Sequence, residues 1–546
     1  MMSNQQDNPA DDVQAFYDVA VIGYGPTGLV AASLLGQAGY RVVVVERWPT
    51  MYGLPRLTHI DGETARIVQA CGDIDQAMRD SLALHTYHYV NAAGELLLEL
   101  EWKGKQCGYT AHNSIYQPDI EDAIHDRVAA LPNVELLRGW EAVFLKQTDD
   151  GVTVAIQRTN TAKDGAQAAK DGQWAEPAKS FGARYVIGAD GANSFVRRSL
   201  GIERNDFGHK HRWLNLDSEN LSDAAERFKL LTIFCDPARG HMYMPIGDNR
   251  TRFEVRLLDG ESIEEWEDPA TGWRWLREKY GVGPEDFKFL RNVVYTFQTR
   301  MAERWREGNV LLGGDAAHAM MPYMGQGACS GMRDGINLAW KLDLVLSGRA
   351  SAALLDSYEA ERRPAGHFTV EQAYTRYVTR TAAYLKAKDY QPLANDFAIE
   401  LGYRYDSAAV ITEPGSPQGH EDPRESFGRP GARAPHLWLT RGGERISTID
   451  LFGDGFVLLA GPKGEAWARA LDAAAHGFAG LSARSHVIGA KADPEERFAA
   501  AFGITPQGAS LVRPDGFVAW RAKNAPDRAA EPELRRVLSR LLRREM

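Results

Sequence analysis

Apolar and polar positions near the N-terminus predict a strand, a helix and a second strand. A β-branched run at residues 19–22 leads into a glycine-rich turn, apolar residues recur at helical spacing over residues 29–37, and another β-branched run covers residues 42–45. Parallel strands need a crossover helix between them, so this order predicts a doubly wound α/β domain. Residues 183–187 and 309–312 predict further strands of the same sheet.

The middle of the chain has a different pattern. Between residues 212 and 296, short runs alternate apolar with polar positions, as in Phe253, Val255 and Leu257, which predicts an antiparallel sheet with one exposed face. Residues 160–179 repeat Ala, Lys, Asp and Gly without periodicity. They predict the tip of a long surface hairpin, to which no function is assigned.

A second change of pattern follows residue 404, where helical sequence gives way to a connector rich in Pro, Gly and charge, GSPQGHEDPRESFGRPGARAPH. Beyond it, apolar runs at residues 456–459 and 485–488, a helix near 464–474 and a turn at 513–516 predict a small α/β unit. The sequence predicts an α/β domain in two parts, residues 1–211 and 297–404, the second of which includes further helices. A sheet domain, residues 212–296, is inserted between them. A linker, residues 405–435, and a C-terminal domain, residues 436–546, follow.

The composition is that of a soluble globular protein. Of the 546 residues, 44% are hydrophobic and 25% charged, and the net charge of −10 is spread along the chain, which argues against a nucleic-acid groove. The first residues, MMSNQQDNPADDVQAFYD, lack the basic and apolar regions of a signal peptide, and no apolar stretch is long enough to span a bilayer. We therefore expect a cytoplasmic protein.

The four cysteines predict neither a disulfide framework nor a zinc site. They show no CxxC spacing and no adjacent histidine cluster, so reduced thiols and no bound metal are expected. They are Cys71, Cys107, Cys235 and Cys329.

Three glycines in VIGYGPTGLV, Gly23, Gly25 and Gly28, give the first chemical signal. Between a strand and a helix, the first permits a tight turn, the second lets a pyrophosphate approach the backbone, and the third lets helix and strand pack closely. Free amides at the helix start favour the pyrophosphate, while Glu46, which ends the second strand, can accept a hydrogen bond from a ribose hydroxyl. A glycine-rich turn without a ligand is the alternative interpretation. The predicted dinucleotide site also includes Pro26, Thr27 and Arg47.

Two later motifs identify a family by resemblance. The segment VIGADGANSFVRRSLGI, with Asp190, Gly191, Ser194 and Arg197, is similar to the DG signature of flavoprotein aromatic hydroxylases. The segment VLLGGDAAHAMMPYMGQGACSGMRDGINLAWKL resembles the GD signature of the same family. The resemblance implies that FAD is the bound dinucleotide.

The resemblance also gives roles to residues of these motifs. It implies that Asp315 accepts a hydrogen bond from the ribityl chain, and that a helix beginning near Gly331 presents amides to the pyrimidine edge of the reduced flavin. It implies that the DG stretch touches flavin and nicotinamide, with Arg197 near the nicotinamide phosphates; Asp190 alone would be interpreted as a turn residue before Gly191. The residues implied to pass close to the flavin ring are Pro322, Gly325, Gly327 and Ala328.

Two further positions match the family outside these motifs. Arg56 in GLPR and Gln117 in IYQPDIE correspond to positions near the flavin diphosphate and the adenosine. Without the resemblance, Arg56 would be interpreted as a solvated loop arginine.

Within the family, the chain resembles the 3-(3-hydroxyphenyl)propionate hydroxylase group over most of residues 17–375, through CDPARGHMYMPIGDNRTRFEVRLLDGES and YTFQTRMAERWREGNVLLGGDAAH. It departs from the family at Cys329, where many members carry asparagine, and at Met321, which replaces the first of two prolines. The C-terminal unit resembles the thioredoxin-like domain of larger family members such as phenol hydroxylase. It lacks both redox cysteines of thioredoxin, so we expect it to serve packing or assembly.

The resemblance implies a phenol hydroxylase that uses NADH or NADPH and O2. NAD(P)H reduces FAD, O2 adds to give a C4a-hydroperoxide, and the electron-rich ring attacks its distal oxygen. The protein must orient the ring, exclude water and help the phenol to ionise. Arg252 and Arg256 are either partners of a substrate carboxylate or an outward-facing charged strand face. No spacing argument chooses a base among four candidates, each also interpretable as a structural polar residue: His59, Asp61, His241 and Tyr243.

Two other functions are kept as alternatives. A flavin-dependent halogenase or oxidase would share the fold, but the halogenase signature WxWxIP is not found and GWRWLREK resembles it only superficially. A non-catalytic flavin-binding protein, with the C-terminal unit as its interaction module, is the other. The choice between NADH and NADPH stays open, and a homodimer is the arrangement that the family implies.

Overall fold

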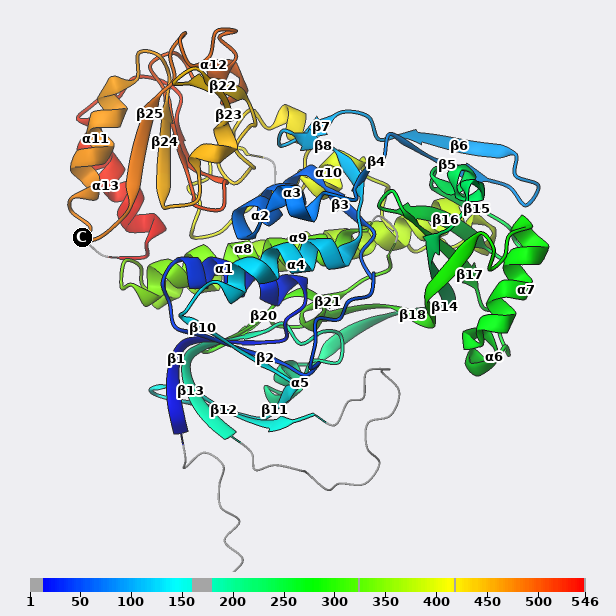
Figure 1. Ribbon diagram of the computed structural model, residues 1–546. Coiled ribbons are helices and arrows are strands. Elements are labelled where there is room, and N and C mark those ends of the chain that lie inside the picture. The colour runs from blue at the N-terminus through cyan, green and yellow to red at the C-terminus, as the bar shows by residue number, and fades with distance from the viewer. Residues whose placement is uncertain (1–12, 160–178, 323–324, 417–418, 545–546) are drawn as a thin grey trace, which may run out of the picture. The chain divides into compact units, whose positions relative to one another are not determined.

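The computed structural model describes residues 13–159, 179–322, 325–416 and 419–544. The hairpin tip predicted at residues 160–179 lies outside the described residues except for its last position. The chain forms two compact units: unit 1 contains residues 1–104, 110–335 and 370–393, and unit 2 contains residues 105–109, 336–369 and 394–546. Figure 1 shows their elements.

The first sheet of unit 1 confirms the predicted parallel α/β core. Strand β1 lies between β2 and β13 and is parallel to both; β10 continues the parallel order beyond β2, and β20 beyond β13. An antiparallel ribbon of β11 and β12 extends the sheet from β13. The strands are β1 (Val13–Ile22), β2 (Val42–Glu46), β10 (Val134–Arg138), β11 (Trp140–Thr148), β12 (Gly151–Arg158), β13 (Lys179–Gly188), β19 (Arg306–Glu307) and β20 (Val310–Leu312).

Helices α1 and α4 pack against each other beside this sheet (Figure 1). The helix predicted after the glycine motif is α1, and Pro26 at its first turn suits a helix start because its missing N–H would have no intrahelical partner. Several short elements lie between these two helices along the chain, and α5 follows β13. The elements are α1 (Pro26–Gln37), α2 (Gly62–Cys71), α3 (Ile74–Ala77), α4 (Gln117–Ala129), α5 (Phe195–Ser199), β3 (His59–Asp61), β4 (Leu82–Ala83) and β9 (His112–Ser114).

The second sheet of unit 1 has the order β21-β18-β14-β17-β16-β15-β5-β6, and its central strands are antiparallel, as predicted. Strands β5 and β6 join it although the sequence assigned residues 1–211 to the α/β domain. β5 pairs with β15, which only the folded chain brings near, and β6 pairs with β5. The elements are β5 (Thr86–Val90), β6 (Leu96–Glu101), β14 (Arg204–Asn220), β15 (Thr232–Phe234), β16 (His241–Ile246), β17 (Arg250–Arg256), β18 (Phe287–Ala302), β21 (His318–Ala319), α6 (Ile263–Glu267) and α7 (Pro269–Tyr280).

The expectation of one solvent-exposed face on this sheet needs correction. One face packs Phe253 and Val255 into a core with Trp266 of α6 and Leu276 of α7. The opposite face, which carries Glu254, lines a cavity. The alternation of apolar and polar residues is real, but the polar side faces an interior space and not bulk solvent.

Unit 2 contains a four-stranded sheet of order β25-β24-β26-β27, in which β24 and β25 are parallel and the other pairs antiparallel. With a helix between β24 and β25 and another after β27, this order agrees with the thioredoxin-like prediction, which otherwise stays a prediction. The elements are β22 (Trp438–Arg441), β23 (Glu444–Ser447), β24 (Phe456–Ala460), α11 (Glu465–Ala475), β25 (Ala483–Val487), α12 (Phe498–Ala501), β26 (Ala509–Val512), β27 (Val518–Ala522) and α13 (Ala530–Leu541).

The residues predicted as a linker, 405–435, belong to unit 2. Tyr405 and Val410 are buried there against Phe517, so the start of this segment supplies apolar anchors that its Pro-rich composition conceals. Two long helices, α8 (Gln326–Leu346) and α9 (Asp356–Arg376), each contribute residues to both units, and the remaining elements are β7 (Lys105–Gln106), β8 (Tyr109–Thr110) and α10 (Asp396–Glu400).

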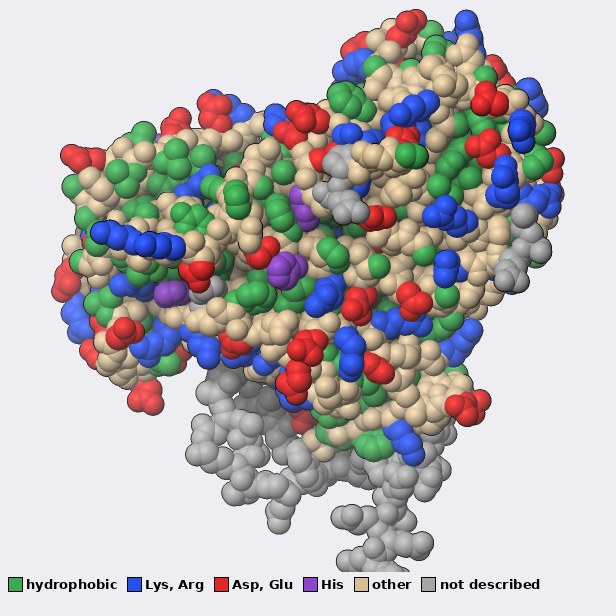
Figure 2. Space-filling model, turned by 180° about the vertical axis from the view of Figure 1, so that it is seen from behind, with side chains coloured by type: hydrophobic (Ala, Val, Ile, Leu, Met, Phe, Trp, Pro, Cys, Tyr) green, Lys and Arg blue, Asp and Glu red, His purple; other side chains and the backbone are tan. Residues whose placement is uncertain are grey.

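Charged side chains of both signs are interspersed on the face shown in Figure 2, as the spread of charge along the sequence predicts. Within the described parts of the chain, no helix combines the length and apolar character that crossing a bilayer requires.

Candidate active site

A cavity of about 730 Å³ lies within unit 1. It runs from the glycine motif at the end of β1 to the inner face of the second sheet, and its volume falls in the range of small-molecule and cofactor sites. Most of the predicted cofactor-binding residues line it, although they come from segments separated by up to about three hundred positions.

The three motif glycines have distinct geometric roles. A Cβ on Gly28 would lie 2.0 Å from the carbonyl oxygen of Gly23, and one on Gly23 would lie 2.3 Å from that of Ala189, so neither position admits a side chain. A Cβ on Gly25 would meet nothing within 4 Å and would project into open space. Gly25 also precedes α1 without any side-chain cap, which leaves the helix-start amides for an anion.

Glu46 is held at the end of β2 by two backbone amides. Its Oε2 accepts from Tyr24 at 2.7 Å and its Oε1 from Trp48 at 2.9 Å. A carboxylate has further lone pairs, so Glu46 can still accept a hydrogen bond from a ribose hydroxyl. The neighbouring Arg47 is exposed. Arg47, Pro26 and Thr27 all line the cavity.

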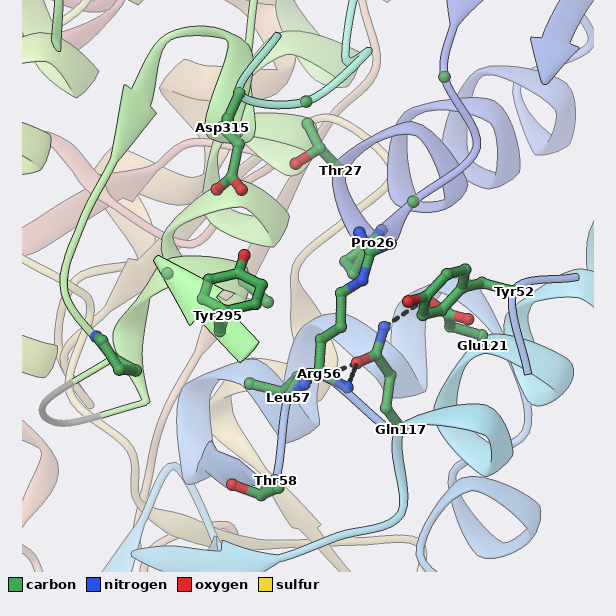
Figure 3. Close-up of a pocket in the computed structure, with 18 of the residues that line it drawn as sticks. Pro26, Thr27, Tyr52, Arg56, Leu57, Thr58, Gln117, Glu121, Tyr295 and Asp315 are labelled. Atoms are coloured by element: carbon green, nitrogen blue, oxygen red, sulfur yellow. Dashed lines mark hydrogen bonds between the residues drawn. The ribbon is translucent and has the colours of Figure 1, made fainter. Parts of the chain in front are cut away.

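Arg56 and Gln117 are connected, as Figure 3 shows. The Oε1 of Gln117 accepts the backbone N–H groups of Arg56 and Leu57 at 2.7 and 2.6 Å, and its Nε2 donates to Glu121 at 2.6 Å. Burial raises the pKa of Glu121 to about 7 against the lowering effect of this hydrogen bond. Gln117 therefore fixes the backbone that directs the Arg56 side chain, whose guanidinium lies 3.8 Å from the ring centroid of Tyr52.

Asp315 directly follows the turn after β20 and lines the cavity, where Figure 3 shows its carboxylate. Burial raises the pKa of this carboxyl, against the nearby His318 and Arg56. The sequence did not single out Asp334, which positions the turn: its Oδ2 accepts from the amide of Gly314 at 3.0 Å and contacts His318 Nε2 at 2.7 Å.

The helix predicted to begin near Gly331 begins five residues earlier, at Gln326. Glycine lowers helix propensity, but here it allows close packing: a Cβ on Gly331 would lie 2.4 Å from Thr27 Oγ1 of α1. The small residues predicted beside a flat ring all line the cavity, just before α8 and in its first turn: Pro322, Gly325, Gly327 and Ala328.

The DG segment is only partly in the cavity. Asp190 and Gly191 line it; Asp190 Oδ2 accepts the amide of Val196 at 3.0 Å, and burial raises the pKa of the carboxyl, while its Oδ1 is buried without a partner in the described residues. Arg197, predicted near the nicotinamide, is buried and donates to the carbonyl of Ile202. Its neighbour Arg198 lines the cavity instead.

Of the four candidate bases, His59 lines the cavity and Asp61 does not. His59 Nε2 lies 3.0 Å from His112 Nδ1, and burial lowers the pKa of His59 to about 4. Asp61 caps α2 through Thr64 and accepts from Arg333 at 2.6 Å. Burial alone would raise the pKa of Asp61, but Arg333 and the Thr64 amide hold it at about 2, which is the state of a structural ion pair.

His241 and Tyr243 lie on the other face of their strand. His241 stacks on Phe234 at 4.3 Å between centroids and donates from Nδ1 to the carbonyl of Arg239, and burial lowers its pKa to about 4. Tyr243 packs into the core with Phe228. Because side chains alternate along a strand, the cavity side of β16 carries Met242 and Met244 instead.

Sequence reasoning missed the polar residues on the cavity face of β14 and β17. Asn215 and Glu254 line the cavity, and the strand run RTRFEVR predicted an outward face because its polar positions alternate with buried Phe253 and Val255. Arg252 is buried and paired with Asp217, and does not face solvent, whereas Arg256 donates to the hydroxyl of Tyr384.

The end of the cavity beneath the second sheet is largely apolar and aromatic. The buried cation Arg376 also lines it, and its Nη1 donates to the Tyr87 hydroxyl at 3.2 Å. The apolar and aromatic lining consists of Tyr87, Tyr89, Trp102, Leu231, Ile233, Met242, Met244, Val293, Phe297 and Met321. Such a chamber accommodates an aromatic ring and excludes water from it.

The polar groups and the open spaces of this site fit a dinucleotide of the size of FAD. The open space at Gly25 suits a pyrophosphate, Glu46 suits a ribose, and Asp315 suits a polyol hydroxyl beside the glycine-rich segment that can accept a flat ring.

Comparisons with known proteins agree with this arrangement. The family described as "FAD binding domain" matches residues 16–373, and the family described as "Aromatic-ring hydroxylase, C-terminal" matches residues 428–544.

Three curated relatives extend the match. A 4-methyl-5-nitrocatechol 5-monooxygenase from Burkholderia sp is 33% identical over 96% of this chain and 97% of its own. A probable NADH-specific resorcinol 4-hydroxylase from Rhodococcus jostii is 36% identical over 74% of each chain. A 3-(3-hydroxy-phenyl)propionate/3-hydroxycinnamic acid hydroxylase from Comamonas testosteroni is 31% identical over 78% of this chain and 71% of its own.

Among solved structures, a ternary complex of aklavinone-11 hydroxylase with FAD and aklavinone superposes with a TM-score of 0.84 at 30% identity, covering 98% of this chain and all of the other.

Proposed function

This chain belongs to the FAD-dependent aromatic-ring hydroxylases, and from that membership we propose that it hydroxylates a small phenol with NADH or NADPH as the electron donor. The observation that carries the proposal is the continuity of the cavity. One end offers the glycine motif and Asp315 to FAD, and the other offers an apolar chamber with two polar side chains, Asn215 and Glu254, to a ring that carries a hydroxyl.

FAD bound here supplies the redox chemistry that joins nicotinamide oxidation to O2 activation. The chain's own residues bind, orient and shield. Gly25 and Glu46 hold the nucleotide half, while Gln117 fixes the backbone of Arg56 near the diphosphate. The apolar chamber beneath the second sheet positions the substrate ring and keeps water away from the reacting atoms.

A phenol that also carries an acidic group, such as 3-(3-hydroxyphenyl)propionate, is the substrate we propose. Arg376 lines the substrate chamber beside Tyr87, so its guanidinium can pair with a substrate carboxylate. The name of the relative from Comamonas testosteroni gives a phenol with a carboxylate as its substrate, which supports this class. The resorcinol 4-hydroxylase supports only a phenolic substrate, because resorcinol has no carboxylate.

The test is turnover by the FAD-loaded protein with each nicotinamide and three phenols: 3-(3-hydroxyphenyl)propionate, resorcinol and 4-methyl-5-nitrocatechol. We expect at least one phenol to accelerate nicotinamide oxidation and to yield a product with one additional hydroxyl, identified by mass spectrometry. Nicotinamide oxidation that yields only H2O2 with every phenol would reject these substrates, and a protein that does not bind FAD would reject the function itself.

A further inference from the structure

Four side chains form a row across the cavity face of the second sheet. In the strand register, Met242 of β16 pairs with Glu254 of β17, Glu254 pairs with Asn215 of β14, and Asn215 pairs with Val293 of β18. Residues paired across strands point to the same face, and all four line the cavity. The row therefore places a polar pair, Glu254 and Asn215, between two apolar side chains.

Glu254 keeps its carboxylate available to a ligand. Its side chain is 7% exposed and makes no hydrogen bond within the described parts of the chain; its ion pair with Arg252 is long, at 3.8 Å between Oε1 and Nη1. Arg252 is instead held elsewhere: it donates to both oxygens of Asp217, at 2.6 and 3.1 Å, and to the carbonyls of Pro55 and Arg56, at 2.9 and 3.2 Å. Glu254 is thus close to a cation without being bonded to it.

Asn215 adds a second polar group beside Glu254. It is 6% exposed, and among the described residues its Oδ1 has no hydrogen-bond partner. A buried polar atom without a partner costs free energy, so a ligand that supplies the missing hydrogen bond is favoured at this position.

We propose that Glu254 accepts the phenolic proton of the substrate and that Asn215 orients the same hydroxyl by donating an amide N–H to the phenolic oxygen, an inference that rests on the proposed function. The O–H bond of the phenol breaks, its electron pair stays on the phenolate oxygen, and the proton forms a new O–H bond on a carboxylate oxygen of Glu254. The carboxylic acid later returns the proton to solvent. A phenolate ring is richer in electrons than the phenol, which favours oxygen transfer to it.

The electrostatic surroundings suit a base that works near neutral pH. Burial raises the pKa of Glu254 to about 7; Arg252 and Arg291 lower it, and Asp217 raises it further. Of the other strands on this face, β18 adds Tyr295, and β16 adds the uncharged Met242 and Met244.

His59 is the competing base, since it also lines the cavity. Its pKa of about 4, lowered by burial, and its contact with His112 make it the weaker proton acceptor at neutral pH.

The test compares Glu254→Gln with Glu219→Gln in the FAD-loaded protein, because Glu219 is a half-exposed carboxylate of β14 that pairs with Lys288 outside the cavity. For a phenol that the wild type hydroxylates, we expect kcat to rise with pH up to about 7 and then level off. Glu254→Gln should lower kcat at pH 7.5 by about 10²-fold and abolish that rise, while Glu219→Gln keeps the wild-type profile.

A second readout needs no turnover. The ring of 4-nitrocatechol absorbs visible light differently as phenol and as phenolate. Because free 4-nitrocatechol already ionises near neutral pH, the spectrum of each complex with oxidised, FAD-loaded protein is followed against pH. The phenolate spectrum should form at lower pH in the wild type than in Glu254→Gln. FAD content and Tm of each variant establish that it is folded.

The possible failures are distinguishable. If Glu254→Gln retains the wild-type pH profile and forms the phenolate spectrum at the same pH as the wild type, Glu254 is not the base although the hydroxylase function stands. If the wild type itself forms no hydroxylated product, the proposed function fails first.

Discussion

At the scale of single residues, two glycines three positions apart have different requirements. A Cβ on Gly25 would project into open space, whereas one on Gly28 would lie 2.0 Å from a backbone oxygen. We therefore expect Gly28 to be needed for folding, and Gly25 to be needed for the close approach of a ligand.

This difference predicts that Gly25→Ala leaves the apoprotein stable but weakens FAD binding. The added methyl group fills the space of the pyrophosphate, so we expect the Kd for FAD to rise at least tenfold, about 1.4 kcal/mol, with an unchanged Tm of the apoprotein. Gly28→Ala serves as the comparison and should lower that Tm strongly. Wild-type FAD affinity in Gly25→Ala, measured by flavin fluorescence, would show that no phosphate lies there.

Glu254 carries a stability cost that its proposed role explains. Its pKa of about 7 in the folded protein exceeds the ordinary value of 4.5, so between these two pH values the folded chain retains a proton that the unfolded chain has released. Stability therefore falls as pH rises through this window, and the full cost is present above pH 7.

Replacing this carboxyl should therefore stabilise the protein in a pH-dependent way. Glu254→Gln is expected to match the wild type near pH 4 and to exceed it by about 3 kcal/mol at pH 8, as measured by urea unfolding of the FAD-loaded protein. A stability difference that is equal at both pH values would mean that Glu254 is not a buried carboxyl of raised pKa.

The cavity contains most of the residues predicted from the sequence to bind the nucleotide, but only one of the four predicted bases. Gly23, Gly25, Gly28 and Glu46 follow a local spacing with a mechanical reason at each position, so no tertiary knowledge was needed. The choice of His241 and Tyr243 rested on residue type alone. Which side of β16 faces the cavity depends on the register of its neighbours, and that register is not visible in one strand.

At the scale of elements, unit 2 is stabilised by an ionic cluster joining its sheet region to its helical segments. Arg513 donates to both oxygens of Glu361, at 2.6 and 2.9 Å, and also to Asp515, and Lys341 donates to Glu361 at 2.7 Å. Although burial opposes it, Arg513 and Lys341 hold the pKa of Glu361 well below its ordinary range. These side chains are almost wholly buried, so each charge depends on its partners.

Arg513→Met should accordingly destabilise unit 2. It leaves two buried carboxylates without their main cation, and we expect a loss of about 3–5 kcal/mol in urea unfolding at neutral pH. The control is Arg484→Met, which breaks the exposed pair with Asp454 and should change stability by less than about 1 kcal/mol. Equal losses of stability in the two variants would show that the buried cluster does not stabilise unit 2 more than an exposed ion pair does.

The sequence predicted the positions of helices and strands where a run or a periodic pattern of apolar residues marks the element. The first strands, α1 and the C-terminal β24 follow apolar runs that stand apart from their flanks. The start of α8 was misplaced because glycine disfavours a helix locally, and only the packing of Gly331 against Thr27 shows why it is tolerated. Strands β5 and β6 were missed for a similar reason, since the pairing of β5 with β15 joins distant parts of the chain.

At the scale of the whole molecule, the candidate active site is assembled from segments that are far apart in the sequence, and none of them forms the cavity alone. The glycine motif, the DG and GD segments and the second sheet all contribute to one cavity within unit 1. The homodimer implied by the family and the assembly role of the C-terminal unit stay predictions, and analytical ultracentrifugation of the FAD-loaded protein tests the former.

We propose that this chain inserts one atom of O2 into a phenol. The most direct test of this proposal is mass spectrometry of the product formed by the FAD-loaded protein from 3-(3-hydroxyphenyl)propionate, resorcinol or 4-methyl-5-nitrocatechol under ¹⁸O2 in ordinary water. We predict one heavy oxygen atom in each molecule of hydroxylated product. A hydroxylated product whose new oxygen comes from water would show that O2 is not the source of the inserted atom and would overturn the proposed reaction.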